Sequence, residues 1–443
     1  GSGTIRRAIE WPPQAGRGPA WQPPAAERIV LQTQPTHQTS KSRGRRVGLA
    51  LAGGGPLGGI YEIGALLALN ESLDGVDLHN VDTYVGVSAG AFVASTLANG
   101  ISSEEMASLL LDRRGRPQRF DPTLFLKPAI GEYARRVSRV PGIVAGGLWD
   151  YLRHPLKVGF VEAMSGLTQA VPTAVFDNRP IERFLADLFS NRSMTNDFRK
   201  LKHQLLIVAV DLDTGQAVRF GAEGHDDVPI SRAVQASTAL PGLYPPVEIN
   251  ERFYVDGGLK RTLHASAALD EGIDLLFCIN PIVPYDASVA PSAPEKRHDT
   301  LVEGGLPVVL SQTFRSMIHS RMKVGMAKYD SAYTDRDVLL FEPDRHDSKM
   351  FFTNVFSYSS REHVCQHAYR TTRRDLLARR RTLEPILARH GIRLDLDVLK
   401  DPARHFTAAL GDTDQRRELG VYKNDLTNRL SRALDRLETA LKL

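Results

Sequence analysis

Short apolar runs and longer segments with helical spacing alternate along the chain from about residue 46 to residue 285. The first run, 47–52, ends in three glycines, and apolar residues then recur at helical spacing over 60–73. A turn at Asp74-Gly75 leads to a second run, 84–87. This order predicts a strand-loop-helix-strand unit whose two strands are parallel, adjacent and joined by a right-handed crossover.

Later apolar runs predict further strands of the same sheet. They cover 205–210, 217–220, 253–255 and 275–279, with a helix over 230–238. We therefore expect an α/β fold, a three-layer α/β/α sandwich with a mainly parallel central sheet. Sites in such sheets form beyond the carboxyl ends of the strands, so the glycines that follow the first strand should lie beside the end of the second.

The same pattern divides the chain into three parts. Residues 1–45, rich in Pro, Gln, Ala and Arg, are predicted to form a flexible leader. Residues 46–290 form the predicted α/β domain, in which 113–180 breaks the strand-helix rhythm and predicts a helical insertion that covers the site. Residues 291–443 are predicted to form a mostly helical C-terminal extension.

This C-terminal extension holds one apolar run that could form a strand, 338–341, and a final amphipathic segment, 426–441. The apolar face of that segment is typical of a helix that packs on its own core or on a second copy of the chain. The net charge of +5 arises mainly after residue 370. Such basic clusters could meet anionic lipid, but a solvated helix face is favoured, and we expect no nucleic-acid partner.

Composition narrows the class of protein. With 42% hydrophobic and 24% charged residues, the chain is neither wholly disordered nor an integral membrane protein. Residues 83–103 carry no charge, but their Gly, Ser, Thr, Ala and Asn content indicates a buried strand, turn and helix rather than a membrane span. No secretory signal is visible, so we expect a cytoplasmic protein or one held peripherally at a membrane.

The segment Gly86-Val87-Ser88-Ala89-Gly90 places a serine between an apolar strand and a helix. This G-x-S-x-G pattern is typical of a nucleophile elbow, in which a sharp turn exposes the serine hydroxyl. Glycines two residues to either side let the backbone bend and keep side chains away from that hydroxyl. Ser88 is therefore the candidate nucleophile.

A serine needs a base to take its proton and donors to stabilise an oxyanion. Gly53, Gly54 and Gly55, between a strand and a helix, can present free backbone N–H groups. The candidate base is Asp256, which ends a predicted strand and precedes Gly257 and Gly258, which leave room around its carboxylate. Asp211 also ends a core strand and is interpreted as structural or as bordering the site.

Together these segments resemble the patatin-like phospholipase family, and 236–246 resembles the helix-to-turn segment that precedes the family's catalytic aspartate. The resemblance implies a patatin-like catalytic domain over 46–290, in which Ser88 and Asp256 form a two-residue dyad. It also implies an oxyanion hole of the N–H groups around Gly54 and Gly55, a lipid or acyl-ester substrate, transient contact with a membrane surface, and no metal or cofactor.

One position departs from the family pattern. Many members carry Arg or Lys two residues after the third loop glycine, where this chain has Leu57. A cation there could support an anionic head group. A phospholipase A activity, a lysophospholipase activity and hydrolysis of a neutral acyl ester therefore all stay open.

Three other interpretations compete. Gly53, Gly55 and Gly58 fit the dinucleotide fingerprint G-x-G-x-x-G, with acidic residues at 74, 77 and 82. An α/β-hydrolase with a Ser-Asp-His triad could use a histidine after Asp256, such as His264. Finally, the chain could be a non-catalytic scaffold that binds lipid or a protein partner through its basic C-terminal helices.

Overall fold

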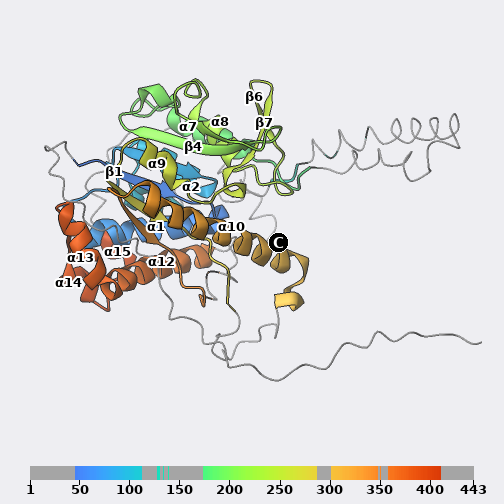
Figure 1. Ribbon diagram of the computed structural model, residues 1–443. Coiled ribbons are helices and arrows are strands. Elements are labelled where there is room, and N and C mark those ends of the chain that lie inside the picture. The colour runs from blue at the N-terminus through green and yellow to red at the C-terminus, as the bar shows by residue number, and fades with distance from the viewer. Residues whose placement is uncertain are drawn as a thin grey trace, which may run out of the picture.

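The computed structural model describes residues 45–111, 173–286, 301–347 and 358–410, together with residues 127–129, 133, 138 and 350. The predicted leader, most of the predicted insertion and the final amphipathic segment lie outside these residues. Within them, an eight-stranded sheet has the order β6-β7-β4-β3-β1-β8-β9, and β5 pairs with β4 (Figure 1).

The centre of this sheet is parallel. Its parallel strands, in spatial order, are β4 (Gln204–Asp211), β3 (Thr83–Val87), β1 (Val47–Leu51), β8 (Leu275–Ile279) and β9 (Asp337–Phe341). Three antiparallel strands complete it: β5 (Ala217–Phe220), β6 (Val247–Ile249) and β7 (Arg252–Asp256). The prediction of a mainly parallel sheet is confirmed, as is the strand at 338–341, which extends this sheet beyond residue 290.

Helices cover both faces of the sheet, because successive side chains of a strand point to opposite sides. Leu49 and Leu51 of β1 belong to one buried apolar cluster, whereas Ala50 and the following Ala52 belong to another. The first cluster is covered by α1 (Gly55–Ser72), α2 (Ala89–Ala98), α3 (Ser103–Leu111), α7 (Arg179–Phe189), α8 (Ile230–Ser237), α12 (Tyr358–Ala378), α13 (Arg380–Arg389), α14 (Leu396–Lys400) and α15 (Phe406–Ala409). The second is covered by α9 (Ala265–Asp270) and α10 (Gly305–Ala332). The three-layer α/β/α arrangement is thus confirmed.

The remaining elements are short. They are the 3-10 helices η3 (Phe198–Lys200), η4 (Gly257–Leu259) and η6 (Leu301–Gly304), and a separate pair of antiparallel strands, β2 (Leu73–Asp74) and β10 (Arg393–Leu394). Among the residues that the structure describes, no helix is both long and apolar enough to cross a membrane.

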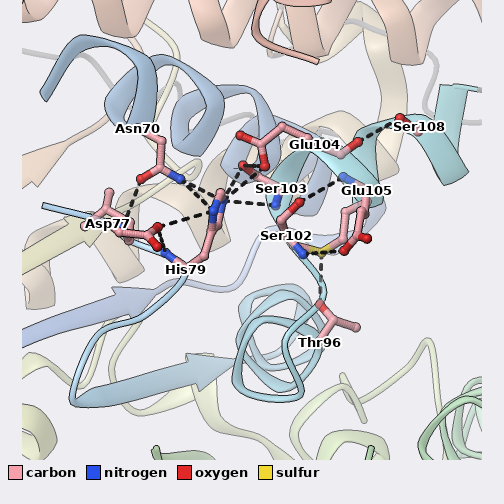
Figure 2. Close-up of polar contacts among 11 residues, drawn as sticks. Asn70, Asp77, His79, Thr96, Ser102, Ser103, Glu104, Glu105 and Ser108 are labelled. Carbon is pink, nitrogen blue, oxygen red and sulfur yellow. Dashed lines mark hydrogen bonds and ion pairs between the residues drawn. The ribbon is translucent and has the colours of Figure 1, made fainter. Parts of the chain in front are cut away.

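A polar cluster at the start of α3 ties this helix to the end of α1 and the loop before β3 (Figure 2). Ser102 and Glu105 form a capping box: Glu105 N donates to Ser102 Oγ over 3.2 Å, and Ser102 N donates to Glu105 Oε2 over 3.0 Å. The next free N–H of the helix, that of Ser103, donates to His79 Nε2 over 3.1 Å. The cluster therefore satisfies the orphan donors of a helix N-terminus.

Ser102→Ala is expected to lower the free energy of unfolding by about 1 kcal/mol, because it leaves the N–H of Glu105 without its acceptor. Urea denaturation monitored by circular dichroism would measure this loss. Ser108→Ala is the matched control, since the Ser108 hydroxyl only donates to the Glu104 carbonyl one turn earlier, so we expect a change within about 0.5 kcal/mol. Equal effects of the two substitutions would contradict the assignment of the cap.

Candidate active site

Ser88 lies at the turn between β3 and α2, with φ 54° and ψ −121°. A non-glycine residue rarely adopts a positive φ, and such strain of about 1–3 kcal/mol persists only where the surrounding structure imposes it. The side chain is mostly buried, with 9% of the residue exposed. This backbone geometry is the sharp strand-to-helix turn that the sequence predicted.

The glycines of the motif serve close packing rather than the bend, because Ser88 itself takes the positive φ. A Cβ on Gly86 would lie 2.5 Å from Ala91 Cα, and a Cβ on Gly90 would lie 2.4 Å from the Leu51 carbonyl oxygen. Both glycines therefore let α2 start directly against β3 and β1. The prediction that these glycines let the backbone bend is therefore corrected: the bend is at Ser88, and the glycines allow close packing.

Ser237, at the end of α8, holds the turn in place. The Ser88 N–H donates to Ser237 Oγ over 2.8 Å, and this hydroxyl donates in turn to the Val208 carbonyl oxygen over 2.6 Å. The side chain is fully buried. Sequence reasoning assigned no role to Ser237, although its segment, 236–246, carried part of the family resemblance.

Asp256 ends β7 and lies at the level of Ser88 in the sheet. In the strand register, Val87 pairs with Val208 on β4, and Asp256 pairs with the next residue of β4, Ala209. β7 runs antiparallel to β4, so the expectation that sites form at the carboxyl ends of parallel strands does not apply to Asp256. The antiparallel register with β4 brings the aspartate to the serine. The backbone is held by a bond from Asp256 N to the Ala239 carbonyl oxygen, 3.0 Å.

The Asp256 carboxyl is buried, and the Ser88 side chain lies close enough to influence its pKa. Burial raises its pKa to about 6, against the lowering effects of the side-chain hydrogen bond with Ser88 and of the Gly258 N–H, which donates to Oδ1 over 2.8 Å. Gly257 is required for packing, since a Cβ there would lie 2.2 Å from the Val208 carbonyl oxygen. The result is a carboxylate able to exchange a proton near neutral pH.

The glycine loop between β1 and α1 lies against Ser88. A Cβ on Gly53 would lie 3.1 Å from Ser88 Cβ and 3.8 Å from its Oγ. Gly54 caps α1 and Gly55 begins it, while Ser88 caps α2, so the positive ends of two helices meet at the serine. In the described part of the chain, the N–H groups of Gly54 and Gly55 have no acceptor, which leaves them free for an anionic oxygen.

Two other polar residues near the site have structural partners. Asp211 accepts hydrogen bonds from Asp213 N and Thr214 N, each 3.0 Å, and from Arg252 Nη1, 2.8 Å, so it holds the turn after β4. His264 is buried, its pKa is lowered to about 4 by that burial, and its Nε2 lies 3.3 Å from the Gly257 carbonyl oxygen. This contact does not position the ring as a base for Ser88.

The acidic residues that a dinucleotide site would need lie elsewhere. Asp82 accepts a 2.7 Å bond from the N–H of Val47 at the start of β1, the sheet edge opposite the glycine loop. Asp74 pairs with Arg393, and Asp77 contacts His79. None of the three is placed to bind a ribose beside the glycines.

The C-terminal end of the predicted insertion contacts the turn between α8 and β6. Phe176 N donates to the Leu243 carbonyl oxygen over 2.8 Å, and the next residue, Asp177, donates its N–H to the Lys127 carbonyl oxygen over 2.8 Å. This turn precedes β7, whose last residue is Asp256. The C-terminal end of the insertion is therefore attached to a segment that leads to the site, whereas residues 113–126 lie outside the described part of the chain.

The fold and the serine turn define the class of α/β proteins that carry a serine between a parallel strand and a helix, beside a glycine-rich loop. Within that class, residues 49–269 match the patatin-like phospholipase family. These residues form a domain of the patatin-like phospholipase family.

Several relatives share this region. The chain is 27% identical over 211 residues to an uncharacterized protein of Acanthamoeba polyphaga mimivirus, covering 47% of this chain and 57% of that protein. It is 27% identical over 237 residues to an uncharacterized NTE family protein of Mycobacterium tuberculosis, covering 54% and 30%. A probable lipid hydrolase of Invertebrate iridescent virus 6 is 20% identical over 206 residues, covering 46% and 58%. The chain thus spans less than two thirds of the length of each of these relatives.

Among solved structures, VipD from Legionella pneumophila is similar, with a TM-score of 0.31 and 16% identity over 73% of this chain and 67% of that chain.

Proposed function

We propose that this protein hydrolyses acyl esters of lipids through an acyl-serine intermediate formed by a dyad of Ser88 and Asp256. The observation that carries the proposal is the buried Asp256 carboxyl, whose pKa is raised by burial and lowered by the nearby Ser88 side chain, next to the free N–H groups of the glycine loop. The fold and the family are consistent with a phospholipase A or a lysophospholipase-type esterase.

In this mechanism, Asp256 takes the proton of Ser88 Oγ as the oxygen attacks the ester carbonyl. The carbonyl oxygen becomes an oxyanion and accepts hydrogen bonds from Gly54 and Gly55. Asp256 then passes its proton to the leaving alcohol, which departs and leaves an acyl group on Ser88. Water gives a proton to Asp256 as it attacks the acyl carbonyl, and that proton returns to Ser88 when the fatty acid leaves.

The described residues indicate the reaction more clearly than they indicate the head group of the substrate. Leu57 is buried in the apolar core, so the position that many family members fill with a cation has no positive charge here. A panel of phosphatidylcholine, lysophosphatidylcholine and monoacylglycerol, with release of fatty acid as the readout, would rank these substrate classes.

A fluorophosphonate probe is expected to label the wild-type protein on Ser88, because the probe reacts with serines that have an activating base. Labelling should disappear in Ser88→Ala. Ser103→Ala is the matched control, because Ser103 Oγ lies 2.8 Å from a ring nitrogen, His79 Nε2, but the residue is fully buried at a helix N-terminus. Unlabelled wild-type protein, or labelling that survives Ser88→Ala, would refute the proposal.

A further inference from the structure

The outer face of α10 exposes apolar side chains. Its inner face packs Met322, Met326 and Tyr329 into the second apolar cluster. The outer face presents Leu310, Phe314 and Met317, at 44%, 43% and 48% exposure, with Val309 at 39% and Val324 at 71%. The solvent-facing side of a helix is ordinarily charged or polar, so this face, hereafter the α10 outer face, calls for a partner.

The same face is cationic in its C-terminal half. Arg321, Lys323 and Lys328 are all exposed, and the one acidic residue in the sequence of α10, Asp330, lies near its end. Most of the exposed apolar residues lie in the first half of the helix, and the cations lie in the second half, around Val324. Binding of a helix to a membrane surface grows with the apolar area that it buries and with the attraction of its basic residues to anionic lipid.

One hydrogen bond joins α10 to the turn that follows the candidate base. Arg321 Nη1 donates to the Leu259 carbonyl oxygen over 2.7 Å, and Leu259 ends η4, the turn directly after Asp256.

We propose that the α10 outer face docks on an anionic lipid bilayer and holds the site at the membrane surface. The proposal rests on the proposed function only in taking the bilayer as the source of substrate. A bilayer offers both an apolar interior and anionic head groups. A second copy of the chain presents the same cations, Arg321, Lys323 and Lys328, and so offers this face no excess of negative charge, because a symmetric contact pairs the same patch with itself.

The test is cosedimentation of the Ser88→Ala protein, which cannot consume the lipid, with vesicles of phosphatidylcholine and phosphatidylserine in equal amounts. We expect strong binding to these vesicles and weak binding to phosphatidylcholine alone. Leu310→Ser/Phe314→Ser should weaken binding by at least about tenfold, because each apolar side chain gains free energy on leaving water. Lys323→Gln/Lys328→Gln should weaken it by roughly fivefold per lysine.

Arg381→Gln/Lys400→Gln is the matched control, since it removes two exposed cations from α13 and α14. This variant should bind vesicles like the parent protein. Hydrolysis of a short, monomeric ester by the same substitutions in the active protein should stay unchanged, which separates docking from catalysis. Binding that is unaffected by the α10 substitutions, or a dimer that only these substitutions dissociate, would overturn the docking proposal while leaving the proposed function intact.

Discussion

Ser88→Ala and Asp256→Asn are each expected to lower kcat/KM for ester hydrolysis by at least about 10⁴-fold. Alanine removes the attacking oxygen. Asparagine keeps the size of the side chain and can still accept the Gly258 N–H, but it cannot take a proton from Ser88. The measurement is steady-state hydrolysis of a monomeric ester that does not depend on a membrane.

The acid limb of the pH profile provides a second readout. The pKa of Asp256 is raised by burial to about 6, and the base must be ionised to act, so wild-type kcat/KM should fall as the pH drops through about 6. The residual activity of Asp256→Asn should lack this limb. Wild-type activity that stays constant from about pH 8 to about pH 4 would contradict the role of Asp256 as the base.

Stability distinguishes loss of the base from loss of the fold. Because the folded pKa of about 6 exceeds the ordinary 3.8, protonation of Asp256 favours the folded state. This contribution is full below the ordinary pKa and is lost as the pH rises through about 6. At about pH 8 the wild type carries a buried charge that Asp256→Asn lacks, so the variant should melt at an equal or higher temperature, with the difference shrinking towards about pH 4.

Gly54→Ala is expected to lower kcat by about 10²–10³-fold, the usual effect of losing one oxyanion donor. A Cβ there would lie 2.7 Å from Gly58 Cα and 2.7 Å from Pro281 Cγ, and the loop must shift to relieve both contacts. The shift moves the N–H groups of Gly54 and Gly55 away from the position of the oxyanion.

Gly100→Ala is the control for this substitution. Gly100 has a positive φ of 84°, but a Cβ there would have no neighbour within 4 Å and would lie outside the site. Gly100→Ala should therefore reduce stability by about 1 kcal/mol and leave kcat unchanged. If Gly54→Ala changed KM and not kcat, the loop would bind the substrate equally in the ground and transition states, and its assignment as the oxyanion hole would fail.

Some of the structure could not be predicted because it depends on contacts between distant segments. The bond from Ser88 N to Ser237 Oγ joins residues 149 positions apart, and no local pattern around Ser237 indicates it. The strand at 338–341 was predicted, but its place in the sheet beside β8 was not, because pairing between segments so far apart in the chain is a tertiary property. The exposed face of α10 is similarly invisible in the sequence, since which side of the helix packs on the sheet is a tertiary property.

The sequence alone determined the elements whose partners are near in the chain. One strand-helix-strand unit contains the run 47–52, the glycine loop and the turn at Ser88. Its two strands are parallel neighbours, so the ends of the strands, with Gly53 and Ser88, lie side by side. Only the tertiary structure decided the position of Asp256. Asp256 lies opposite Ala209, and therefore beside Ser88, because β7 pairs with β4 in an antiparallel register. Neither composition nor periodicity indicates which strand β7 pairs with or in which register.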